Sequence, residues 1–346
     1  NGVKDILESG YLTMGSKVKE FEQEFSNYID TKHAVAVNSG TSALEIPLRA
    51  LGVANKTVII PTITFMATPL AAIHAGAKVI FVDVMPENLS IDPDDLRRKI
   101  RNDTAGVILV HIGGIISPYL HDIEKICQDN GLFLIEDAAH ACGASMGNIK
   151  AGNLGDVACF SFFPTKNITT GEGGMIICNN QEDYDLLYSM RSHGWSRNLK
   201  NQKKIEKKYP KIDPKFIFVN SGFNLRPTDV AASVANSQLK RIDKFIKIRK
   251  ANSLKIKNAL LKSKEWNEQF SFQKINSNIK PSLFGFPIFM HKKFFKKKKK
   301  FLKFLDKEGV ETRPIISGNF LNQPSVKLFK LNKKNEKFPE AQKVEN

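Results

Sequence analysis

The stretch HAVAVNSGTSALEIPLRALGVANKTVIIP, residues 33–61, joins two short apolar runs through one helical pattern and decides the class of fold. The same order, an apolar run followed by a helical pattern, recurs up to about residue 178, with further apolar runs at 78–84, 105–111 and 132–137. Strands that alternate with helices in this way predict a parallel sheet covered by helices on both faces. We therefore expect an α/β fold.

The chain has 346 residues and a hydrophobic fraction of 42%, which is enough for one large domain and a smaller second one. A long helical pattern runs from Thr228 towards Leu261 and is long enough to lead from the first domain into the second. We expect a large ligand-binding α/β domain over residues 1–240, with the N-terminal segment packing on the small domain. Residues 241–346 then form a smaller C-terminal α+β domain.

Lysine and arginine outnumber aspartate and glutamate by 52 to 35, which gives a formal net charge of +17 and a surface that attracts anions. Two lysine-rich runs, at 200–211 and 291–304, hold much of this excess. A solvated surface or a lysine-biased composition explains such runs, and an anionic substrate accounts for part of the rest. Because no basic motif interleaved with aromatic residues is present, we expect no nucleic-acid partner.

The four cysteines, Cys127, Cys142, Cys159 and Cys178, include no C-x-x-C pair. We therefore expect no metal site and reduced thiols. No uninterrupted apolar run approaches the roughly 20 residues of a membrane span, and the first residues lack the order of a signal peptide. The sequence predicts a soluble, cytoplasmic protein without a membrane partner.

Ligands of a parallel sheet lie beyond the carboxyl ends of its strands, so residues that follow the apolar runs are candidates for a site. After the first run, Ser39, Gly40 and Thr41 open a helix whose free N–H groups and dipole favour an anion, although an ordinary helix start has the same pattern. After the second run, Phe65 either offers its ring to a flat ligand or packs in the core. No dinucleotide or nucleoside triphosphate motif is present.

The run at 132–137 ends in a carboxylate, Asp137, which is costly to bury unless a cation or several donors meet it. Asp137 is therefore a candidate to bind a protonated ring nitrogen, with a helix cap or a structural ion pair as alternatives. His140 follows three residues later. The next apolar run contains Ser161 and leads to Lys166; a lysine in a desolvated pocket has a lowered pKa and forms a Schiff base with a carbonyl.

Together these candidates describe one site with an anion cup, an aromatic ring, a carboxylate for a ring nitrogen and an imine-forming lysine, each at a strand end. These are the requirements of pyridoxal 5'-phosphate, whose pyridinium ring accepts electrons only while its nitrogen stays protonated beside an acid. The combination of the four features predicts this cofactor, whereas each feature alone has a plain structural explanation.

Five segments resemble, in their order and spacing, the DegT/DnrJ/EryC1/StrS aminotransferases: NSGTSAL (38–44), PTITFMAT (61–68), IEDAAHA (135–141), FSFFPTKNITTGEGG (160–174) and GFNLRPTDVAA (222–232). The resemblance covers nearly the whole chain. It implies fold-type I of the aspartate aminotransferase superfamily, with a mainly parallel seven-stranded sheet and a smaller C-terminal domain. It also implies that a C-terminal piece of the small domain is missing.

By this resemblance Lys166 is the catalytic residue, which holds the cofactor and then moves the proton between substrate and cofactor. Asp137 pairs with the ring nitrogen, and Asn224 reaches the phosphate of the neighbouring subunit's cofactor, which implies a homodimer with shared active sites. The other implied cofactor-binding residues are Ser39, Gly40, Thr41, Phe65, His140 and Ser161. Weaker candidates for substrate contact are His193, Arg226 and Arg313.

The resemblance implies a nucleotide-sugar aminotransferase. An amino donor, L-glutamate, converts the cofactor to pyridoxamine 5'-phosphate, which then aminates a keto sugar of a nucleoside-diphosphate-linked deoxyhexose. The product is an amino sugar for a surface polysaccharide such as lipopolysaccharide.

Two segments depart from the usual family pattern. HIGGIISPYLHDI (111–123) replaces a Tyr-Gly-x-Pro-x-Asp type of stretch, and TRPIISGNFLNQP (312–324) resembles the dehydratase branch of the family, which removes a sugar 3-hydroxyl. That branch carries histidine in place of the lysine, so Lys166 favours transamination. The alternatives are a sugar-nucleotide 3-dehydratase, a basic nucleic-acid-binding protein and a regulator that keeps the fold without catalysis.

Overall fold

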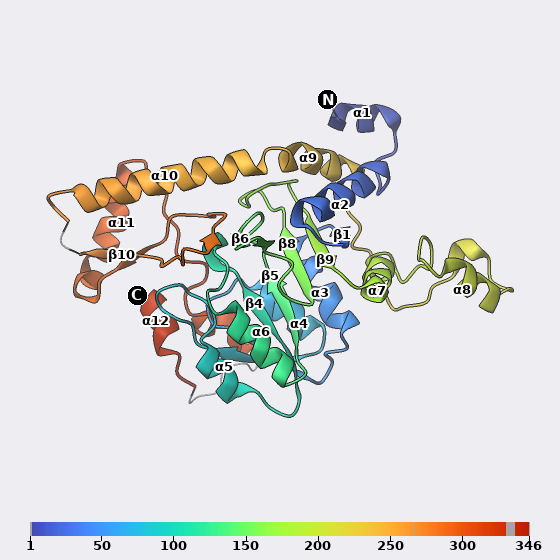
Figure 1. The fold of residues 1–346 in the computed structure, drawn as a ribbon, viewed down its shortest axis with the longest axis horizontal. Coiled ribbons are helices and arrows are strands. Elements are labelled where there is room, and N and C mark those ends of the chain that lie inside the picture. Colours follow the sequence, from blue (N-terminus) through green and yellow to red (C-terminus); the bar gives the residue numbers. More distant parts are fainter. Residues whose placement is uncertain (1, 267, 330–335, 346) are drawn as a thin grey trace.

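The computed structural model describes residues 2–266, 268–329 and 336–345, and its centre is a seven-stranded sheet in the order β1-β9-β8-β5-β4-β2-β3 (Figure 1). Neighbouring strands pair in parallel, except that β9 is antiparallel to both β1 and β8. The strands are β1 (His33–Val37), β2 (Thr57–Pro61), β3 (Lys78–Val82), β4 (Thr104–Val110), β5 (Phe133–Asp137), β8 (Val157–Ser161) and β9 (Gly174–Cys178). The predicted α/β fold with a mainly parallel seven-stranded sheet is confirmed.

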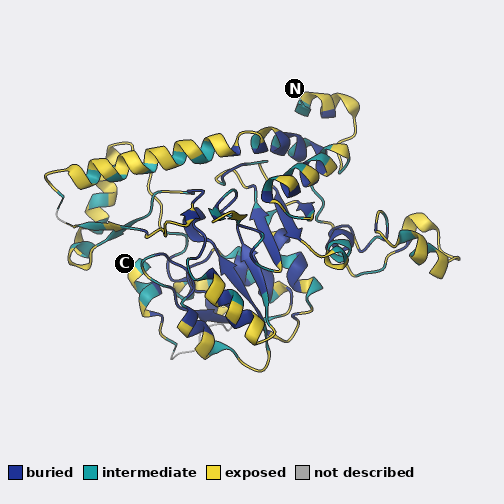
Figure 2. Cartoon of the chain, in the orientation of Figure 1, coloured by how far each residue is buried: buried dark blue, intermediate teal, exposed yellow. Residues whose placement is uncertain are grey.

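Helices cover both faces of this sheet because successive residues of its strands point into two different cores. Ile59 packs in one core and Ile60 in the other, and full burial of such a side chain contributes about 1.5–3 kcal/mol. The first core is closed by α2 (Ser16–Ile29), α5 (Pro93–Lys99), α6 (Leu120–Asp129) and α9 (Asp229–Leu239), the second by α3 (Gly40–Ala50), α4 (Ala67–His74) and α7 (Gln181–Arg191). Figure 2 shows the sheet buried between these layers.

The long helical pattern that runs from Thr228 towards Leu261 forms two helices rather than one continuous helix. Helix α9 ends at Leu239, Lys240 and Arg241 form a turn, and α10 runs over Ile242–Lys262. Packing explains the break: α9 lies buried against α2, whereas α10 buries only its first residue and runs out along the edge of the molecule (Figure 1). Within the described ranges, no helix combines the length and the apolar character needed to cross a membrane.

Beyond α10 the described residues form small sheets and several short helices. Strands β10 (Phe270–Phe272) and β12 (Ile288–Met290) pair with each other. Strand β11 (Ile279–Lys280) pairs instead with β6 (Ser145–Met146), which in turn pairs with β7 (Ile149–Lys150). The lysine-rich run contains a 3-10 helix, Lys292–Lys297, followed by α11 (Lys298–Lys307).

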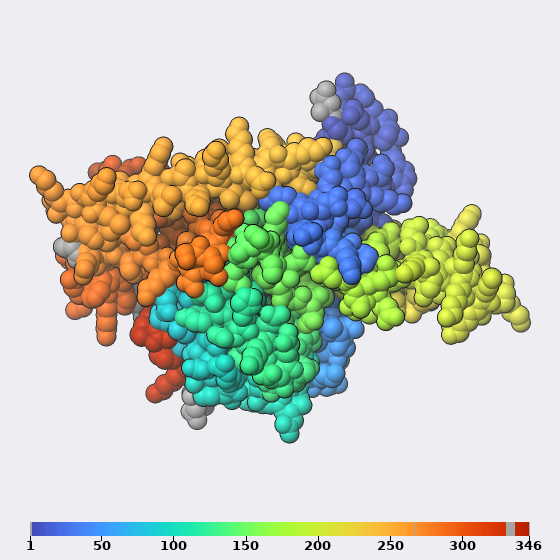
Figure 3. All heavy atoms as spheres, in the orientation of Figure 1, coloured from blue at the N-terminus to red at the C-terminus, as the bar shows by residue number. Residues whose placement is uncertain are grey.

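Two segments project from the body of the molecule. The N-terminal helix α1 (Gly2–Ser9) lies beside α9, a helix of the predicted large domain, residues 1–240. Helix α8 (Gln202–Lys208) lies at the tip of a long excursion that stands away from the sheet (Figure 3). This stretch, which is basic and weakly patterned in the sequence, has no buried residue in α8.

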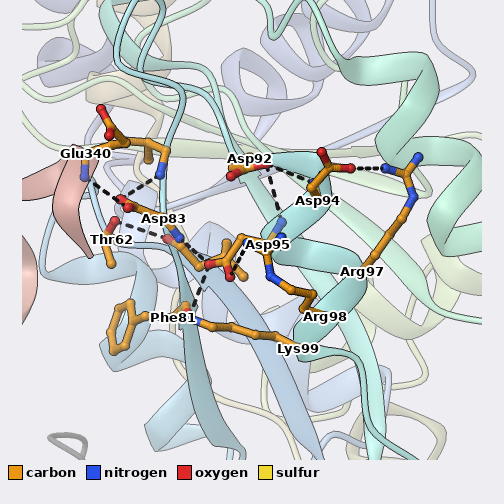
Figure 4. A network of polar contacts seen from close by, with 12 residues as sticks. Thr62, Phe81, Asp83, Asp92, Asp94, Asp95, Arg97, Arg98, Lys99 and Glu340 are labelled. Atoms are coloured by element: carbon orange, nitrogen blue, oxygen red, sulfur yellow. Dashed lines mark hydrogen bonds and ion pairs between the residues drawn. The ribbon is translucent and has the colours of Figure 1, made fainter. Parts of the chain in front are cut away.

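The end of the chain returns to the sheet. The buried carboxylate of Asp83, just after β3, accepts hydrogen bonds from the backbone amides of Glu340 (3.0 Å) and Ala341 (2.9 Å) at the start of α12 (Pro339–Glu345) (Figure 4). A carboxylate at this position favours a helix N-terminus. Residues near the end of the chain also join the core beside α3 and α4, namely Phe320, Val326, Phe338 and Ala341. The division at residue 240 stays a prediction.

The four cysteines are free and buried. Burial raises the pKa of the Cys127, Cys142 and Cys178 thiols to about 12, and it raises that of Cys159 as well. Thiols with such pKa values stay protonated at neutral pH and are poor nucleophiles. The cysteines therefore act as small apolar core residues.

Candidate active site

Lys166 lies in the loop that follows β8, where its backbone amide donates to the carbonyl of Phe163 in a turn (2.9 Å). The side chain is half-buried, and its Nζ lies 5.1 Å from the centre of the Phe284 ring. Burial lowers the pKa of the Lys166 amine, and the charge of Asp137 opposes this effect. A lowered pKa makes the neutral, nucleophilic amine more available than in an exposed lysine.

Asp137 ends β5 and is buried. Its Oδ2 accepts a hydrogen bond from the Thr68 hydroxyl (2.9 Å), and its Oδ1 accepts one from the backbone amide of Ala139 (3.2 Å). No lysine, arginine or histidine of the described ranges forms an ion pair with this carboxylate, although the charge of Lys166 acts on it. Burial raises the pKa of the Asp137 carboxyl, as expected for a buried acid that lacks a cation in contact.

Glu136, the neighbouring carboxylate, has a different environment because it points to the other face of the strand. Its Oε1 accepts hydrogen bonds from the amides of Leu154 (2.7 Å) and Gly155 (2.9 Å). Its Oε2 accepts one from the amide of Gly152 (2.8 Å) and lies 2.9 Å from Nε2 of the buried His111. These contacts satisfy the carboxylate, so Glu136 holds a loop and Asp137 is the carboxylate that is free to bind a cationic ligand.

His140 lies in the turn after β5 and is buried. Burial and the charge of Lys166 lower the pKa of its imidazole to about 3, so the ring is neutral at physiological pH. The ring stacks on Phe284, with ring centres 4.0 Å apart and planes 4° from parallel. Its Nδ1 is buried and has no hydrogen-bond partner in the described part of the chain.

The predicted anion cup lies where the start of α3 meets the end of β8. The Ser39 hydroxyl accepts a hydrogen bond from the amide of Ser42 (3.1 Å) and is thus engaged as the N-cap of α3. A Cβ on Gly40 would lie 2.6 Å from Cβ of Ser161, so only glycine permits this approach. The first N–H groups of a helix have no acceptor within the helix, so Gly40 and Thr41 present donors beside the Ser161 hydroxyl.

Phe65 follows β2 and is 63% exposed. The ring is therefore not a core residue, which removes one of the two explanations that the sequence allowed. Exposing an aromatic ring forgoes the stabilisation that its burial would contribute. Such a ring is available to stack on a planar ligand or to contact a partner chain.

Three further predicted residues gather around Trp195 in the segment that precedes α8. The guanidinium carbon of Arg226 lies 5.8 Å from the centre of the Trp195 ring, and the ring of His193 lies 6.1 Å from it. Asn224 accepts a hydrogen bond from Nε of Arg226 (3.1 Å) and is exposed. No contact in the described ranges joins this group to Lys166 within one chain.

Arg313 is also separate from Lys166. Its side chain is 74% exposed and pairs with Glu311 (2.8 Å) in solvent. The segment that carries it nevertheless passes near the site, because the hydroxyl of Ser317 donates to the carbonyl of Thr64 (2.7 Å), beside Phe65. The structure thus brings the segment to the site and leaves the arginine itself in a surface ion pair.

Three further residues near Lys166, Asp137 and His140 are not predicted from the sequence. Thr68 is contained in the segment 61–68, but only the fold shows that its hydroxyl reaches Asp137. Asn167 follows the lysine, is buried, and binds Ser282 through Nδ2. Phe284 comes from the part of the chain beyond α10 and carries no local signal, since its role depends on contacts with residues more than 100 positions away.

The residues present fit pyridoxal 5'-phosphate. Asp137 lacks the cation that a protonated pyridine nitrogen provides, and Lys166 has the lowered pKa that an imine-forming amine requires. The start of α3 and Ser161 offer donors to a phosphate, and Phe65 offers an open ring face. These groups come from the carboxyl ends of β1, β2, β5 and β8, which is where a parallel sheet binds its ligands.

Comparison with known proteins shows the family to which the chain belongs. The model of the DegT/DnrJ/EryC1/StrS aminotransferase family matches residues 1–346. The chain is 31% identical to GDP-4-keto-6-deoxy-D-mannose 3-dehydratase of Yersinia pseudotuberculosis, over 95% of this chain and 84% of that protein. It is 34% identical to UDP-4-amino-4,6-dideoxy-N-acetyl-beta-L-altrosamine transaminase of Campylobacter jejuni, over 88% of this chain and 77% of that protein.

Among solved structures, the chain superposes on GDP-4-keto-6-deoxy-D-mannose-3-dehydratase of E. coli with bound hydrated PLP. The TM-score is 0.89 at 27% identity, and the match covers 99% of this chain and 89% of the other. The fold is therefore shared over 99% of the chain.

Proposed function

Because the chain belongs to the DegT/DnrJ/EryC1/StrS aminotransferase family, we propose that it transfers an amino group from L-glutamate to the keto sugar of a nucleoside-diphosphate-linked deoxyhexose, with pyridoxal 5'-phosphate bound at Lys166. The observation that carries this proposal is the meeting of Lys166 and Asp137 from two different strand ends, close enough for the charge of each to act on the pKa of the other.

When bound, the cofactor supplies an electron sink for the electrons released at the substrate carbon. Lys166 would hold it covalently and, once displaced by substrate, would carry the proton between the substrate carbon and the cofactor. Its lowered pKa suits this exchange because the neutral amine is the proton acceptor. Asp137 would keep the ring nitrogen protonated, and the exposed ring of Phe65 would be available to stack on the cofactor ring.

The start of α3 and the hydroxyl of Ser161 would bind the phosphate, and His140 would offer a neutral imidazole to the cofactor. The net charge of +17 draws anionic substrates such as a diphosphate towards the molecule. A sugar nucleotide formed in this way serves the synthesis of a surface polysaccharide such as lipopolysaccharide, and we place the reaction in the cytoplasm.

A second candidate is the removal of a sugar 3-hydroxyl. It is favoured by the similarity to GDP-4-keto-6-deoxy-D-mannose 3-dehydratase along 95% of this chain. Against it stands the primary amine of Lys166 at the centre of the site, which is able to hold the cofactor covalently and to return it to that state after each turnover.

Incubation with 15N-labelled glutamate separates the two candidates. We expect the label to appear in the sugar nucleotide when the chain is given the cofactor and a panel of GDP-, UDP- and dTDP-linked 4-keto-6-deoxy sugars. Mass spectrometry of the sugar nucleotides reads the result. An unlabelled 3-deoxy product would overturn the aminotransferase proposal in favour of the dehydratase.

We further propose that the working form is a homodimer in which each subunit supplies Asn224 to the other's cofactor phosphate. Two features support this arrangement: the Asn224 side chain is exposed, and the excursion around α8 exposes apolar rings, with Phe216 57% and Phe218 50% exposed. Exposed aromatic residues that gather on one segment are typical of a protein interface.

Mixing two inactive variants tests the shared site. Lys166→Ala and Asn224→Ala are each expected to be inactive alone, because every site lacks one residue. Unfolding and refolding a 1:1 mixture is expected to restore about one quarter of the wild-type activity, since half of the two-fold dimers then hold one complete site of two. Activity that stays at the level of the separate variants would show that Asn224 acts within its own chain or not at all.

A further inference from the structure

A short segment from the part of the chain beyond α10 crosses back to the active site. We call residues 278–284 the strap. It begins at Asn278, whose carbonyl accepts a hydrogen bond from the amide of Gly147 (2.8 Å), and continues as β11, which pairs with β6. The strap then reaches the loop after β4, where the amides of Ser282 and Phe284 donate to the carbonyls of Gly114 and Gly113 (2.9 Å each).

Two consecutive glycines make this docking possible. Gly113 and Gly114 have φ values of 71° and 83°, a left-handed backbone that other residues rarely adopt. A Cβ on Gly114 would lie 1.9 Å from the Ser282 carbonyl oxygen and 2.8 Å from that of His140. Both glycines belong to the segment HIGG (111–114), which departs from the usual family pattern. The unusual sequence thus occurs where the backbone makes this close contact.

Two side chains fix the strap further. Asn167, the neighbour of Lys166, donates from Nδ2 to the carbonyl (3.1 Å) and hydroxyl (2.8 Å) oxygens of Ser282, and both residues are buried. From the other side, Arg249 of α10 donates to the carbonyls of Leu283 (3.0 Å) and Phe284 (3.3 Å). The strap therefore connects the lysine loop, the end of β4 and α10.

The last residue of the strap covers the active site. The Phe284 ring lies parallel to the His140 imidazole at 4.0 Å and 5.1 Å from Nζ of Lys166. Stacked aromatic rings prefer a defined mutual geometry, so this contact holds the imidazole in one orientation. Since Nδ1 of His140 has no hydrogen-bond partner in the described ranges, stacking is the contact that orients the imidazole.

We propose that Phe284, delivered by the strap, is a positioning residue that fixes the His140 ring and shields Lys166 from water, so that the site is complete only while the strap is docked on Gly113 and Gly114. Phe284 does not touch the reacting atoms in this account; it acts through His140 and Lys166. The importance of this role for catalysis rests on the proposed function, whereas the contacts of Phe284 are independent of it.

The test follows the titration of His140 by NMR in the full-length chain labelled with 13C-histidine, before and after the addition of pyridoxal 5'-phosphate. The chain has seven histidines, and a His140→Gln variant identifies the signal of interest. In the wild type the His140 signal is expected to stay constant from about pH 8 to about pH 4.5, because its pKa is about 3. Phe284→Ala admits water to one ring face and is expected to raise the midpoint by about one pH unit or more.

Matched variants make the result specific. Phe284→Tyr keeps the ring and is expected to behave as the wild type, whereas Phe284→Leu keeps an apolar side chain without the ring and is expected to shift the midpoint upward. These substitutions leave Lys166 and Arg249, the charged residues beside the stack, in place. Because Phe284→Leu is the milder change, it provides the measurement if Phe284→Ala does not fold.

The docking part of the proposal is tested at the glycine. Gly114→Ala is expected to give the same upward shift of the His140 midpoint, and Gly309→Ala, at a similar φ of 75° but with no atom within 4 Å of its Cβ, is expected to give none. A His140 midpoint unchanged in Phe284→Leu and Gly114→Ala would overturn the proposal. The titration of His140 before the addition of pyridoxal 5'-phosphate needs neither cofactor nor substrate. Its result is therefore independent of whether the chain has the proposed aminotransferase activity.

Discussion

Lys166→Ala is expected to abolish turnover of glutamate, with a loss of at least about 10²–10⁴-fold in the rate of the half-reaction, because the residue both holds the cofactor and transfers the proton. Lys166→Arg is expected to be equally inactive, since a guanidinium keeps its proton at all accessible pH values. Stopped-flow absorbance after mixing the cofactor-loaded protein with glutamate measures the rate.

The control for this loss is an exposed lysine in the excursion around α8. Lys200→Ala removes a positive charge from the same basic protein and is expected to retain the wild-type rate, because Lys200 is exposed and lies outside the group around Asp137. Turnover of glutamate at a wild-type rate by Lys166→Ala would contradict the account, whatever the behaviour of the control.

Asp137→Asn is expected to lower the rate of the half-reaction by roughly 10²–10³-fold, the usual effect of removing one preorganised electrostatic contact from an active site. The amide has the shape of the carboxylate but cannot keep a ring nitrogen protonated. In the protein without cofactor the same change is expected to raise the urea midpoint, because an unpaired buried carboxylate is costly. Opposite effects on stability and activity are typical of a functional residue.

Glu136 provides the matched control on the same strand. Glu136→Gln replaces one carboxylate oxygen by an NH2 donor and leaves a buried amide donor without its acceptor, so it is expected to cost about 1–3 kcal/mol of stability. The fraction that stays folded is expected to react with glutamate at close to the wild-type rate. A lower urea midpoint for Asp137→Asn, together with an unchanged rate, would mean that Asp137 is the structural residue.

The difference between Glu136 and Asp137 shows what the sequence determines locally. Both carboxylates end the same apolar run, but successive residues of a strand face opposite sides of the sheet. Only Asp137 therefore faces the side on which Lys166 lies. The order of strands and helices also follows from local pattern, since apolar runs of strand length alternate with helical ones. Residues that follow each strand are therefore predictable as candidates, and the structure brings Lys166, Asp137 and His140 together.

Contacts between distant segments cannot be predicted from the local sequence. The antiparallel insertion of β9 between β1 and β8, the break between α9 and α10, and the return of α12 to Asp83 all depend on tertiary packing. The strap is the clearest case, because Phe284 and His140 are more than 100 residues apart and neither carries a motif for the stack.

The measurement that tests the central claim most directly is the site of covalent attachment. The wild-type chain is incubated with pyridoxal 5'-phosphate, reduced with borohydride, digested and mapped by mass spectrometry. In a chain with 52 lysines and arginines, the account predicts that one lysine, Lys166, carries the reduced cofactor at a 1:1 ratio. Label distributed over the surface lysines with an unmodified Lys166 would contradict it.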